Sequence, residues 1–391
     1  MKIFIDVAHC SLTKYGEELC GDKVEIVKLP QCTIIVLADG LGSGVKANIL
    51  ATLTTKISAT MLKEGADIYE TLDTIASTLP VCKEREIAYS TFTLIKISNE
   101  GKVYMAEYDN PKAFILSGKQ EKNIGKKKLI INNRKIYEST FNVKPGDSIT
   151  IVSDGIIHAG LGNTMNFGWT WDNVLNYIQR NIENKNDAHS IAKDLVEVCW
   201  DLYGHKPGDD ATVVNIKIKR PEYVDLFTGP PKNREKDEEI ISKFINNREG
   251  KKIICGGTAA NIASRELGKK LIVDLDSFSE DIPPIAFMEG FDLITEGVIT
   301  LNKTIEIIKE YKKSLSFPGK YYEVSKEDGA SKLAHILLHE CTHLNIWSGK
   351  AVNPAHQNPD LPVDLGIKLK LVKELKELLK SLGKEVNLIE F

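Results

Sequence analysis

Four aspartates stand at positions where a carboxylate could hold a cation or act as a base. Asp39 follows five apolar residues, Ile34–Ala38, and precedes a run with three glycines, Gly40–Gly44, in which the backbone can turn sharply. The other three aspartates also lie at turns next to strand-like segments, and they are Asp22, Asp154 and Asp209. If the strands are neighbours, these carboxylates converge at one edge of the fold.

Clustered carboxylates repel one another and are costly to bury unless a cation neutralises them. Oxygen ligands without a nearby His or Cys suit Mg²⁺ or Mn²⁺ rather than Zn²⁺. Two such ions can lower the pKa of a bridging water and polarise a phosphoryl oxygen for in-line attack. The alternative is a set of independent turn aspartates, because acid–glycine pairs are common in turns.

Hydrophobic periodicity predicts the elements that must position these residues. Helical spacing predicts helices over 45–63, 67–78, 170–183 and 187–203. Alternating or continuous apolar runs predict strands over 1–7, 23–29, 33–38, 89–97, 103–108, 113–117, 128–131, 134–138, 148–152 and 211–218. Many antiparallel strands with two inserted helix pairs indicate two sheets packed face to face with helices outside, an α+β fold.

Four segments together resemble a known family in their order and separation: Cys20-Gly21-Asp22, Ala38–Gly44, Ser153-Asp154-Gly155 and Asp209–Val214. The family is the metal-dependent type 2C serine/threonine protein phosphatases, specifically their bacterial SpoIIE-type and RsbX-type branch, and the resemblance covers about residues 1–220. It implies a β-sandwich flanked by helices, two Mn²⁺ or Mg²⁺ ions, and hydrolysis of phosphoserine or phosphothreonine in a partner protein. In that branch the usual substrate is a phosphoserine on an anti-sigma-factor antagonist or a stressosome component.

The resemblance also implies roles for individual residues. Asp39 would bridge both ions, and Gly40 would offer its backbone carbonyl to one of them. Asp22 would reach the second ion, while Asp154 and Asp209 would complete the first. Asp39, Asp154 and Asp209 are thus the expected catalytic residues, with the water between the metals as nucleophile.

The sequence departs from many eukaryotic relatives at two places. Leu41 stands where they carry a histidine, so the general acid is unassigned, and no arginine lies near Asp22 to clamp the phosphate. Lys14 and Lys23 are candidates to replace that arginine. His158 follows Asp154 closely enough to reach the site, although a polar loop residue is the simpler interpretation.

A domain boundary is expected over 221–238, where Gly-Pro-Pro precedes a dense charged run typical of a linker. Residues 239–391 then alternate short strands and helices, which predicts a smaller α/β domain. We expect this domain to bind a small-molecule or protein regulator. Strands are expected near 252–255, 271–273 and 291–294, and helices over 259–267, 301–314, 328–341 and 365–382.

Three motifs in this second domain could carry chemistry. His339-Glu340-Cys341-Thr342-His343 fits the H-E-x-x-H pattern of zinc peptidases, which requires both histidines on one helix, with His335 and His356 as further ligands. Strand-like alternation over Thr342–Trp347 argues against that helix. Gly256-Gly257-Thr258 could bind an anion or form a tight turn, and the loop Asn353–Asp360 could line a pocket or simply connect elements.

Composition excludes several classes of protein. A net charge of −3 argues against a general nucleic-acid binder, and the sequence has no apolar run long enough to span a membrane. Seven scattered cysteines without a C-x-x-C pair indicate thiols in a reducing compartment, so a cytoplasmic location is expected. The rivals to a phosphatase are an inactive binding module of the same fold and a zinc peptidase in the second half.

Overall fold

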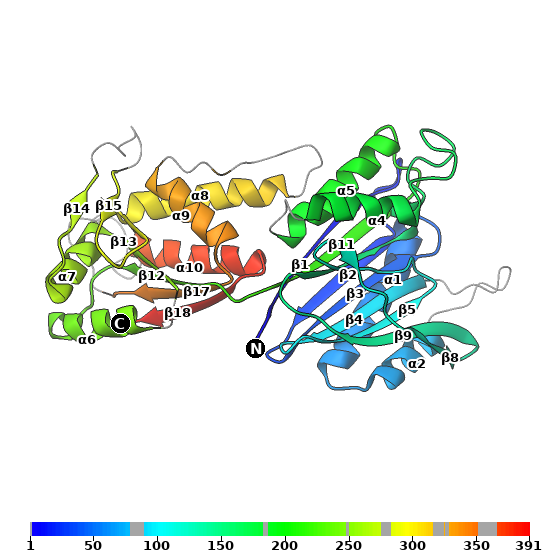
Figure 1. Cartoon of the computed structure of the whole chain (residues 1–391), viewed down its shortest axis with the longest axis horizontal. Helices are drawn as coiled ribbons and strands as arrows, with labels where there is room; N and C mark the ends of the chain where they lie inside the picture. Colours follow the sequence, from blue (N-terminus) through cyan, green and yellow to red (C-terminus); the bar gives the residue numbers. More distant parts are fainter. Residues whose placement is uncertain are drawn as a thin grey trace. The chain divides into compact units, whose positions relative to one another are not determined.

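The computed structural model describes residues 2–78, 90–182, 187–247, 250–274, 283–315, 324, 328–350 and 366–391. The chain divides into two compact units, Met1–Arg220 and Pro221–Phe391 (Figure 1).

Two antiparallel sheets form the frame of the first unit. One sheet has the order β1 (Phe4–Leu12), β11 (Ala211–Lys219), β10 (Asp147–Val152), β6 (Phe114–Ser117), β7 (Gln120–Glu121). The other has the order β2 (Asp22–Lys28), β3 (Cys32–Gly40), β4 (Ser90–Ser98), β5 (Lys102–Tyr108), β9 (Arg134–Asn142), β8 (Lys127–Ile131).

The inner faces of the two sheets share one apolar core. Alternate residues of each strand point into it, such as Ile35 and Leu37 on β3 and Ile149 and Ile151 on β10, and all four are fully buried. Fully burying an aliphatic side chain contributes about 1.5–3 kcal/mol, so this layer supplies much of the stability of the unit.

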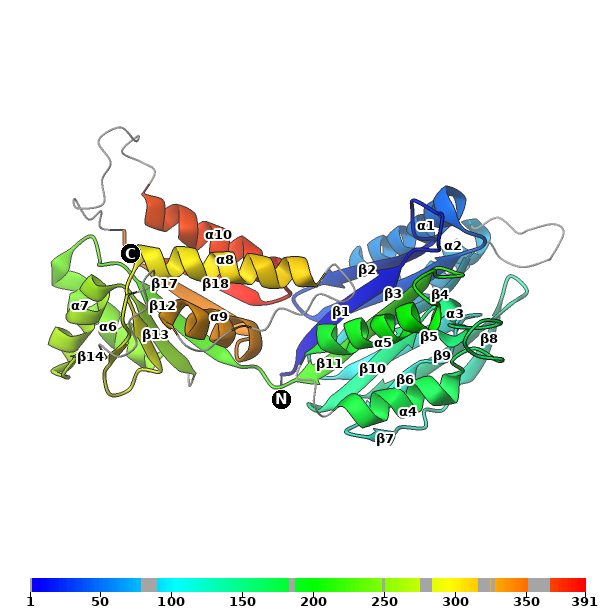
Figure 2. The ribbon, with the colours of Figure 1, turned by 90° about the horizontal axis from the view of Figure 1, so that it is seen from above.

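Helices cover both outer faces of this sandwich (Figure 2). The helices α1 (Gly44–Lys63) and α2 (Ile68–Thr78) pack on the sheet that contains β3. The helices α4 (Trp171–Asn181) and α5 (Ala188–Leu202) pack on the sheet that contains β10, and the short α3 (Asp154–Ile157) follows β10 directly. The predicted α+β sandwich with outer helices is confirmed.

The second unit is built on one largely parallel sheet of order β14-β15-β16-β13-β12-β17-β18. Its strands are β12 (Tyr223–Thr228), β13 (Lys251–Cys255), β14 (Ile272–Val273), β15 (Ala286–Phe287), β16 (Leu293–Thr295), β17 (His343–Ser348) and β18 (Glu385–Glu390). The helices α6 (Asp237–Asn246) and α7 (Gly257–Leu267) cover one face, and the other is covered by α8 (Val298–Ser314), α9 (Gly329–His339) and α10 (Ile367–Ser381) (Figure 2).

The expectation of a linker over 221–238 is wrong. Residues Tyr223–Thr228 form β12, which lies between β13 and β17 in the middle of the sheet. The charged run continues through a 3₁₀ turn, Arg234–Lys236, into α6, whose Ile240, Ile241 and Phe244 are buried. Apart from the buried Asp237, the charges of this run are exposed, which explains why they resembled a solvated linker.

The cysteines of the described residues are free thiols: Cys10, Cys20, Cys32, Cys199, Cys255 and Cys341. Cys82 and the loop Asn353–Asp360, which includes His356, lie outside the described residues. Among the helices that the structure describes, none is long and apolar enough to cross a membrane.

Candidate functional site

Asp22 and Asp39 face each other across two neighbouring antiparallel strands. They are Cα partners at one end of the β2–β3 ladder. The adjacent pair is hydrogen bonded, since Gly40 N donates to Gly21 O at 3.3 Å. Asp22 and Asp39 therefore occupy the non-hydrogen-bonded position, where opposed side chains stand closest. Both lie on the inner face of the sheet, because Leu37 and Ile35 alternate with Asp39 into the shared core.

The turn that follows Asp39 requires glycine at one position. A Cβ on Gly40 would lie 2.0 Å from the backbone oxygen of Ala47 on α1, so no larger residue fits without moving the helix. The other side of the site is tied to the same helix, because Asn48 Nδ2 donates to Cys20 O at 2.7 Å. Helix α1 thus fixes both the Asp22 turn and the Asp39 turn.

The end of β10, in the opposite sheet, meets Asp22 through Ser153. The Ser153 hydroxyl donates to Asp22 Oδ2 at 2.7 Å and accepts from Thr212 N at 2.8 Å. Asp154 is the next residue and opens α3 at an exposed position. Tyr203 OH donates to Gly155 O at 2.7 Å, which anchors α3 to α5. The serine was part of the motif in the sequence, but no local signal pairs it with an aspartate 131 positions away.

Asp209 and Asp210 form the turn that leads into β11. Asp209 is half-buried and its Oδ1 accepts from Asp210 N at 3.0 Å. Asp210 is only 4% exposed, and its Oδ1 accepts from Lys14 N at 3.0 Å. A Cβ on Gly21 would lie 2.8 Å from Asp210 Oδ2, so this carboxylate packs against the turn that carries Asp22. The sequence motif indicated a role for Asp209 at this turn but none for Asp210.

The electrostatics show that these carboxylates converge. Burial first, and then the negative charges of Asp22, Asp154 and Asp209, raise the pKa of Asp39. The pKa of Asp22 is raised mainly by burial, which outweighs the hydrogen bond from Ser153. The pKa of Asp209 is raised by burial and by the charge of Asp154. The cluster therefore carries more negative charge than the surrounding hydrogen-bond donors of the chain compensate.

A cation would satisfy this donor set. Asp22 is 3% exposed, and in the part of the chain that the structure describes neither its Oδ1 nor Asp210 Oδ2 has a hydrogen-bond partner. Such orphaned buried oxygens cost free energy unless a positive charge or a donor reaches them. Within the same described residues, no group of three or more His, Cys, Asp or Glu side chains is placed so that it could hold a metal ion. The chemistry of these carboxylate oxygens fits a divalent cation, although the side chains as placed do not form a closed ligand set.

Of the other charged residues considered for this site, one lies at it and the others do not. Lys14 lies at the site, because its backbone N–H binds Asp210 and its charge lowers the pKa of Asp209. Lys23 pairs with Ala38 and has the opposite strand parity from Asp22, so its side chain leaves the other face of the sheet. His158 is exposed at the end of α3.

Residues 30–219 match the family model described as stage II sporulation protein E (SpoIIE). This segment is a SpoIIE domain. It includes Asp39, Asp154 and Asp209, whereas Asp22 precedes the matched residues.

The chain is also similar to a curated protein and to solved structures. Stage II sporulation protein E of Bacillus subtilis (strain 168) is 26% identical over 222 residues, which are 56% of this chain and 26% of that protein. The chain therefore spans about a quarter of the curated relative it matches. One similar solved structure is the PP2C phosphatase domain of Bacillus subtilis SpoIIE with a fragment of its regulatory domain. It is 25% identical with a TM-score of 0.48, and the match covers 56% of this chain and 64% of that one. RsbX in complex with magnesium is 18% identical with a TM-score of 0.40, covering 55% and 96%.

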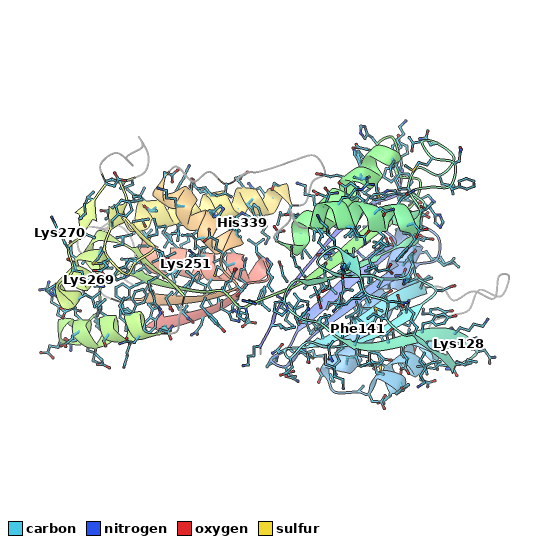
Figure 3. All side chains as sticks on the ribbon, viewed as in Figure 1. Lys128, Phe141, Lys251, Lys269, Lys270 and His339 are labelled. Carbon is cyan, nitrogen blue, oxygen red and sulfur yellow. The ribbon has the colours of Figure 1, made fainter. Side chains whose placement is uncertain are left out.

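Outside the SpoIIE domain, the H-E-x-x-H geometry is not formed. Helix α9 ends at His339, which is labelled in Figure 3, and β17 begins at His343, so the two histidines do not share a helix. His343 Nε2 instead lies 3.1 Å from Glu385 Oε2 on β18. Glu340, the general base of such a motif, lies 3.2 Å from His335 and 3.1 Å from Lys251. The strand-like alternation noted in the sequence decides this arrangement, and the zinc peptidase interpretation loses its structural basis.

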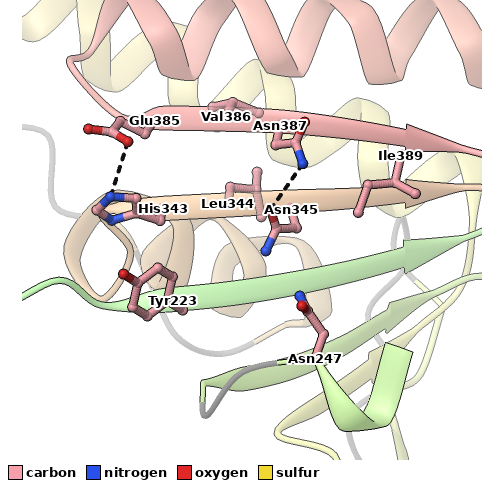
Figure 4. Close-up of a pocket in the computed structure, with 9 residues that line it drawn as sticks. All are labelled: Tyr223, Asn247, His343, Leu344, Asn345, Glu385, Val386, Asn387 and Ile389. Carbon is pink, nitrogen blue, oxygen red and sulfur yellow. Dashed lines mark hydrogen bonds and ion pairs between the residues drawn. The ribbon is translucent and has the colours of Figure 1, made fainter. Parts of the chain in front are cut away.

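A pocket of about 350 Å³ lies on the sheet face of the second unit (Figure 4). Its floor is made by β12, β17 and β18, and its polar residues bind one another: His343 pairs with Glu385, and Asn387 Nδ2 lies 3.5 Å from Asn345 Oδ1. Beneath it, the fully buried Asp225 Oδ1 accepts from Asn247 at 2.7 Å and from Asn345 and Trp347 at 3.0 Å. Because the polar residues that line the pocket are bound to one another and to Asp225, we interpret them as a hydrogen-bond network that holds the sheet together.

Proposed function

We propose that the SpoIIE domain is a metal-dependent protein phosphatase that hydrolyses phosphoserine or phosphothreonine in a partner protein. The observation that carries the proposal is the convergence of Asp22, Asp39, Asp154 and Asp209 at one end of the sandwich, with raised carboxyl pKa values and an orphaned buried oxygen on Asp22. Such excess negative charge suits Mn²⁺ or Mg²⁺. The match to the SpoIIE family model supports the same activity.

In this proposal the chain's own residues divide the work. Asp39 lies among the other three carboxylates and would bridge two cations, with the Gly40 carbonyl beside it. Asp154 and Asp209 would complete the coordination of the first ion, and Asp22 would complete that of the second. Two bound cations supply an activated water and a positive charge facing the phosphoryl oxygens. Ser153 holds Asp22 in place through its hydroxyl, and Lys14 adds positive charge near Asp209.

The partner is proposed to be a phosphorylated signalling protein, and the class that fits the SpoIIE and RsbX branch is an anti-sigma-factor antagonist or a stressosome component. The free thiols support action in a reducing compartment such as the cytoplasm. The second unit is proposed to be a regulatory or ligand-binding domain, because its parallel sheet is a common support for small-molecule sites.

The test is release of phosphate from a phosphoserine peptide by the full chain with Mn²⁺. We expect the native protein to release phosphate. Asp39→Asn and Asp154→Asn should lower the rate of phosphate release on the order of 100-fold or more, because losing a metal ligand should cost more than losing a residue that only orients one. Glu64→Gln is the matched control, because this carboxylate is 70% exposed at the end of α1. Equal activity of the native protein and Asp39→Asn would contradict the proposal. Two bound Mn²⁺ ions without phosphate release would instead support an inactive binding module.

A further inference from the structure

The strand order of the second unit contains a topological switch point. The parallel strands run in space as β16-β13-β12-β17-β18, while the chain visits β12, β13 and β16 before it returns to β17 and β18. The connections that leave β12 and β17 therefore depart in opposite directions. In open parallel sheets a crevice opens at this point, outside the carboxyl ends of the two strands, and ligands bind there.

The backbone at the carboxyl ends of β12 and β17 is held close by glycines. Gly349 N donates to Thr228 O at 3.0 Å, and a Cβ on Gly349 would lie 2.1 Å from Pro230 O. Gly229, directly after β12, has φ +75°, a conformation that favours glycine. Both glycines are buried, so these features bring the ends of β12 and β17 close together where larger residues would not fit.

A lysine lies directly over these glycines. Lys368, in the first turn of α10, donates through Nζ to Gly349 O, and a Cβ on Gly229 would lie 2.0 Å from the same nitrogen. Burial lowers the pKa of Lys368. Across the described ranges, no carboxylate forms an ion pair with Lys368. The N-terminus of α10, a helix of 15 residues, adds partial positive charge at the same place.

Ser348 supplies a second, independent signal. Its side chain is fully buried, and within the described residues its Oγ has no hydrogen-bond partner. Ser348 is the register partner of Thr228 and shares the strand face of Leu344 and Ile346, which pack in the same core as Leu375 of α10. The hydroxyl therefore lies on the face of the sheet that α10 covers, one residue before the carbonyl that binds Lys368. A buried hydroxyl without a partner is costly unless a ligand completes it.

Another helix N-terminus at this edge, that of α7, already has a carboxylate beside it. A Cβ on Gly257, the first residue of α7, would lie 3.2 Å from Glu296 Oε1, so a carboxylate of the chain itself stands by that helix start. The Gly256-Gly257-Thr258 turn is therefore a poor site for an external anion. At the N-terminus of α10, by contrast, no carboxylate of the described residues compensates the charge of Lys368.

We propose that the switch point of the second unit binds the phosphate group of a small molecule, with Lys368 Nζ and Ser348 Oγ as donors beside Gly229 and Gly349. A compact ammonium at a helix N-terminus is a common phosphate site. A ligand held here would contact β12, β17 and α10 together, and this site is separate from the aspartate cluster of the SpoIIE domain.

The proposal is tested by calorimetric titration of the full chain with inorganic phosphate in EDTA, which keeps divalent cations from the aspartate cluster. We expect saturable binding that Lys368→Gln weakens at least about tenfold and that Lys368→Arg retains. Lys370→Gln is the control, because Lys370 is an exposed lysine of the same helical turn. Asp39→Asn should bind phosphate as the native protein does, which separates this site from the proposed phosphatase site.

Ser348→Ala distinguishes a ligand site from a structural contact. It should weaken phosphate binding without lowering the unfolding temperature of the ligand-free protein, because the hydroxyl has no hydrogen-bond partner among the described residues to lose. Three results would overturn the proposal: no saturable phosphate binding, equal weakening by Lys368→Gln and Lys370→Gln, or acetate binding as tightly as phosphate.

Discussion

Asp22 and Asp39 oppose each other across β2 and β3, one register position from the hydrogen bond between Gly40 and Gly21. Placing two acids in the closest cross-strand position is destabilising by itself. The pairing is retained at the end of the sandwich where Ser153 reaches Asp22 from the opposite sheet. This concentration of negative charge leads to the first prediction.

Without divalent cations, the stability of the protein should fall as the pH rises. Burial and neighbouring charges raise the pKa of Asp22 and Asp39 in the folded state above the ordinary carboxyl value of the unfolded chain. Their contribution is then fully present below the ordinary value and is lost as the pH rises through the raised values. Thermal unfolding in EDTA across this window, compared with Asp39→Asn, isolates the contribution. A native protein whose pH dependence matches that of Asp39→Asn contradicts it.

Added Mn²⁺ should oppose this loss of stability at high pH. The cation binds the deprotonated carboxylates and takes over the charge compensation that bound protons supply at low pH. The gain in unfolding temperature on adding Mn²⁺ should therefore grow with pH over the same window. A gain that is independent of pH would mean that the ion binds elsewhere.

Ser153→Ala should weaken Mn²⁺ binding by about 10–100-fold, the usual cost of losing an outer partner of a metal ligand. The reason is that Ser153 Oγ links Asp22 Oδ2 to Thr212 N, with contacts of 2.7 and 2.8 Å. Ser148→Ala is the control, since Ser148 is a buried serine of β10, the strand that leads to Ser153, and it accepts from Asn215 at 3.1 Å. Equal Mn²⁺ affinities for the two variants, measured by calorimetry, would remove Ser153 from the site.

Gly40→Ala should destabilise the SpoIIE domain by about 1–3 kcal/mol, the cost of overpacking. The added methyl would overlap the backbone oxygen of Ala47, which cannot rotate away as a side chain can. Gly125→Ala is the control, because a Cβ there meets nothing within 4 Å, and it should change stability by no more than about 0.5 kcal/mol. Denaturant unfolding measures both, and equal midpoints would show that β3 and α1 can separate freely.

Asp225→Ala should destabilise the second unit by about 3–5 kcal/mol. Asp225 is the buried partner of Lys252, which would remain as an uncompensated charge. Glu310→Ala removes an exposed pair with Lys313 and should cost no more than about 1 kcal/mol. If the two variants unfold at the same temperature, Asp225 does not hold the sheet together.

Local patterns in the sequence were enough to place most elements of the first unit. The run Ile34–Ala38 predicts a buried strand because its apolar residues are contiguous, and β3 contains it. Helix 45–63 follows from apolar residues at helical spacing, and α1 ends at the same residue. The acids at strand ends are visible because turns have a local chemistry of their own. Each of these signals acts within a few residues of the chain.

The tertiary structure decided which of these residues meet. Asp22 lies next to Asp39 because of the β2–β3 register, and Ser153 reaches Asp22 because the two sheets pack face to face. In the second unit, the segment that looked like a linker became the central strand β12, and His343 joined β17 instead of a helix with His339. Strand pairing and sheet packing gain their free energy from residues far apart in the chain, so no local window of the sequence contains that information.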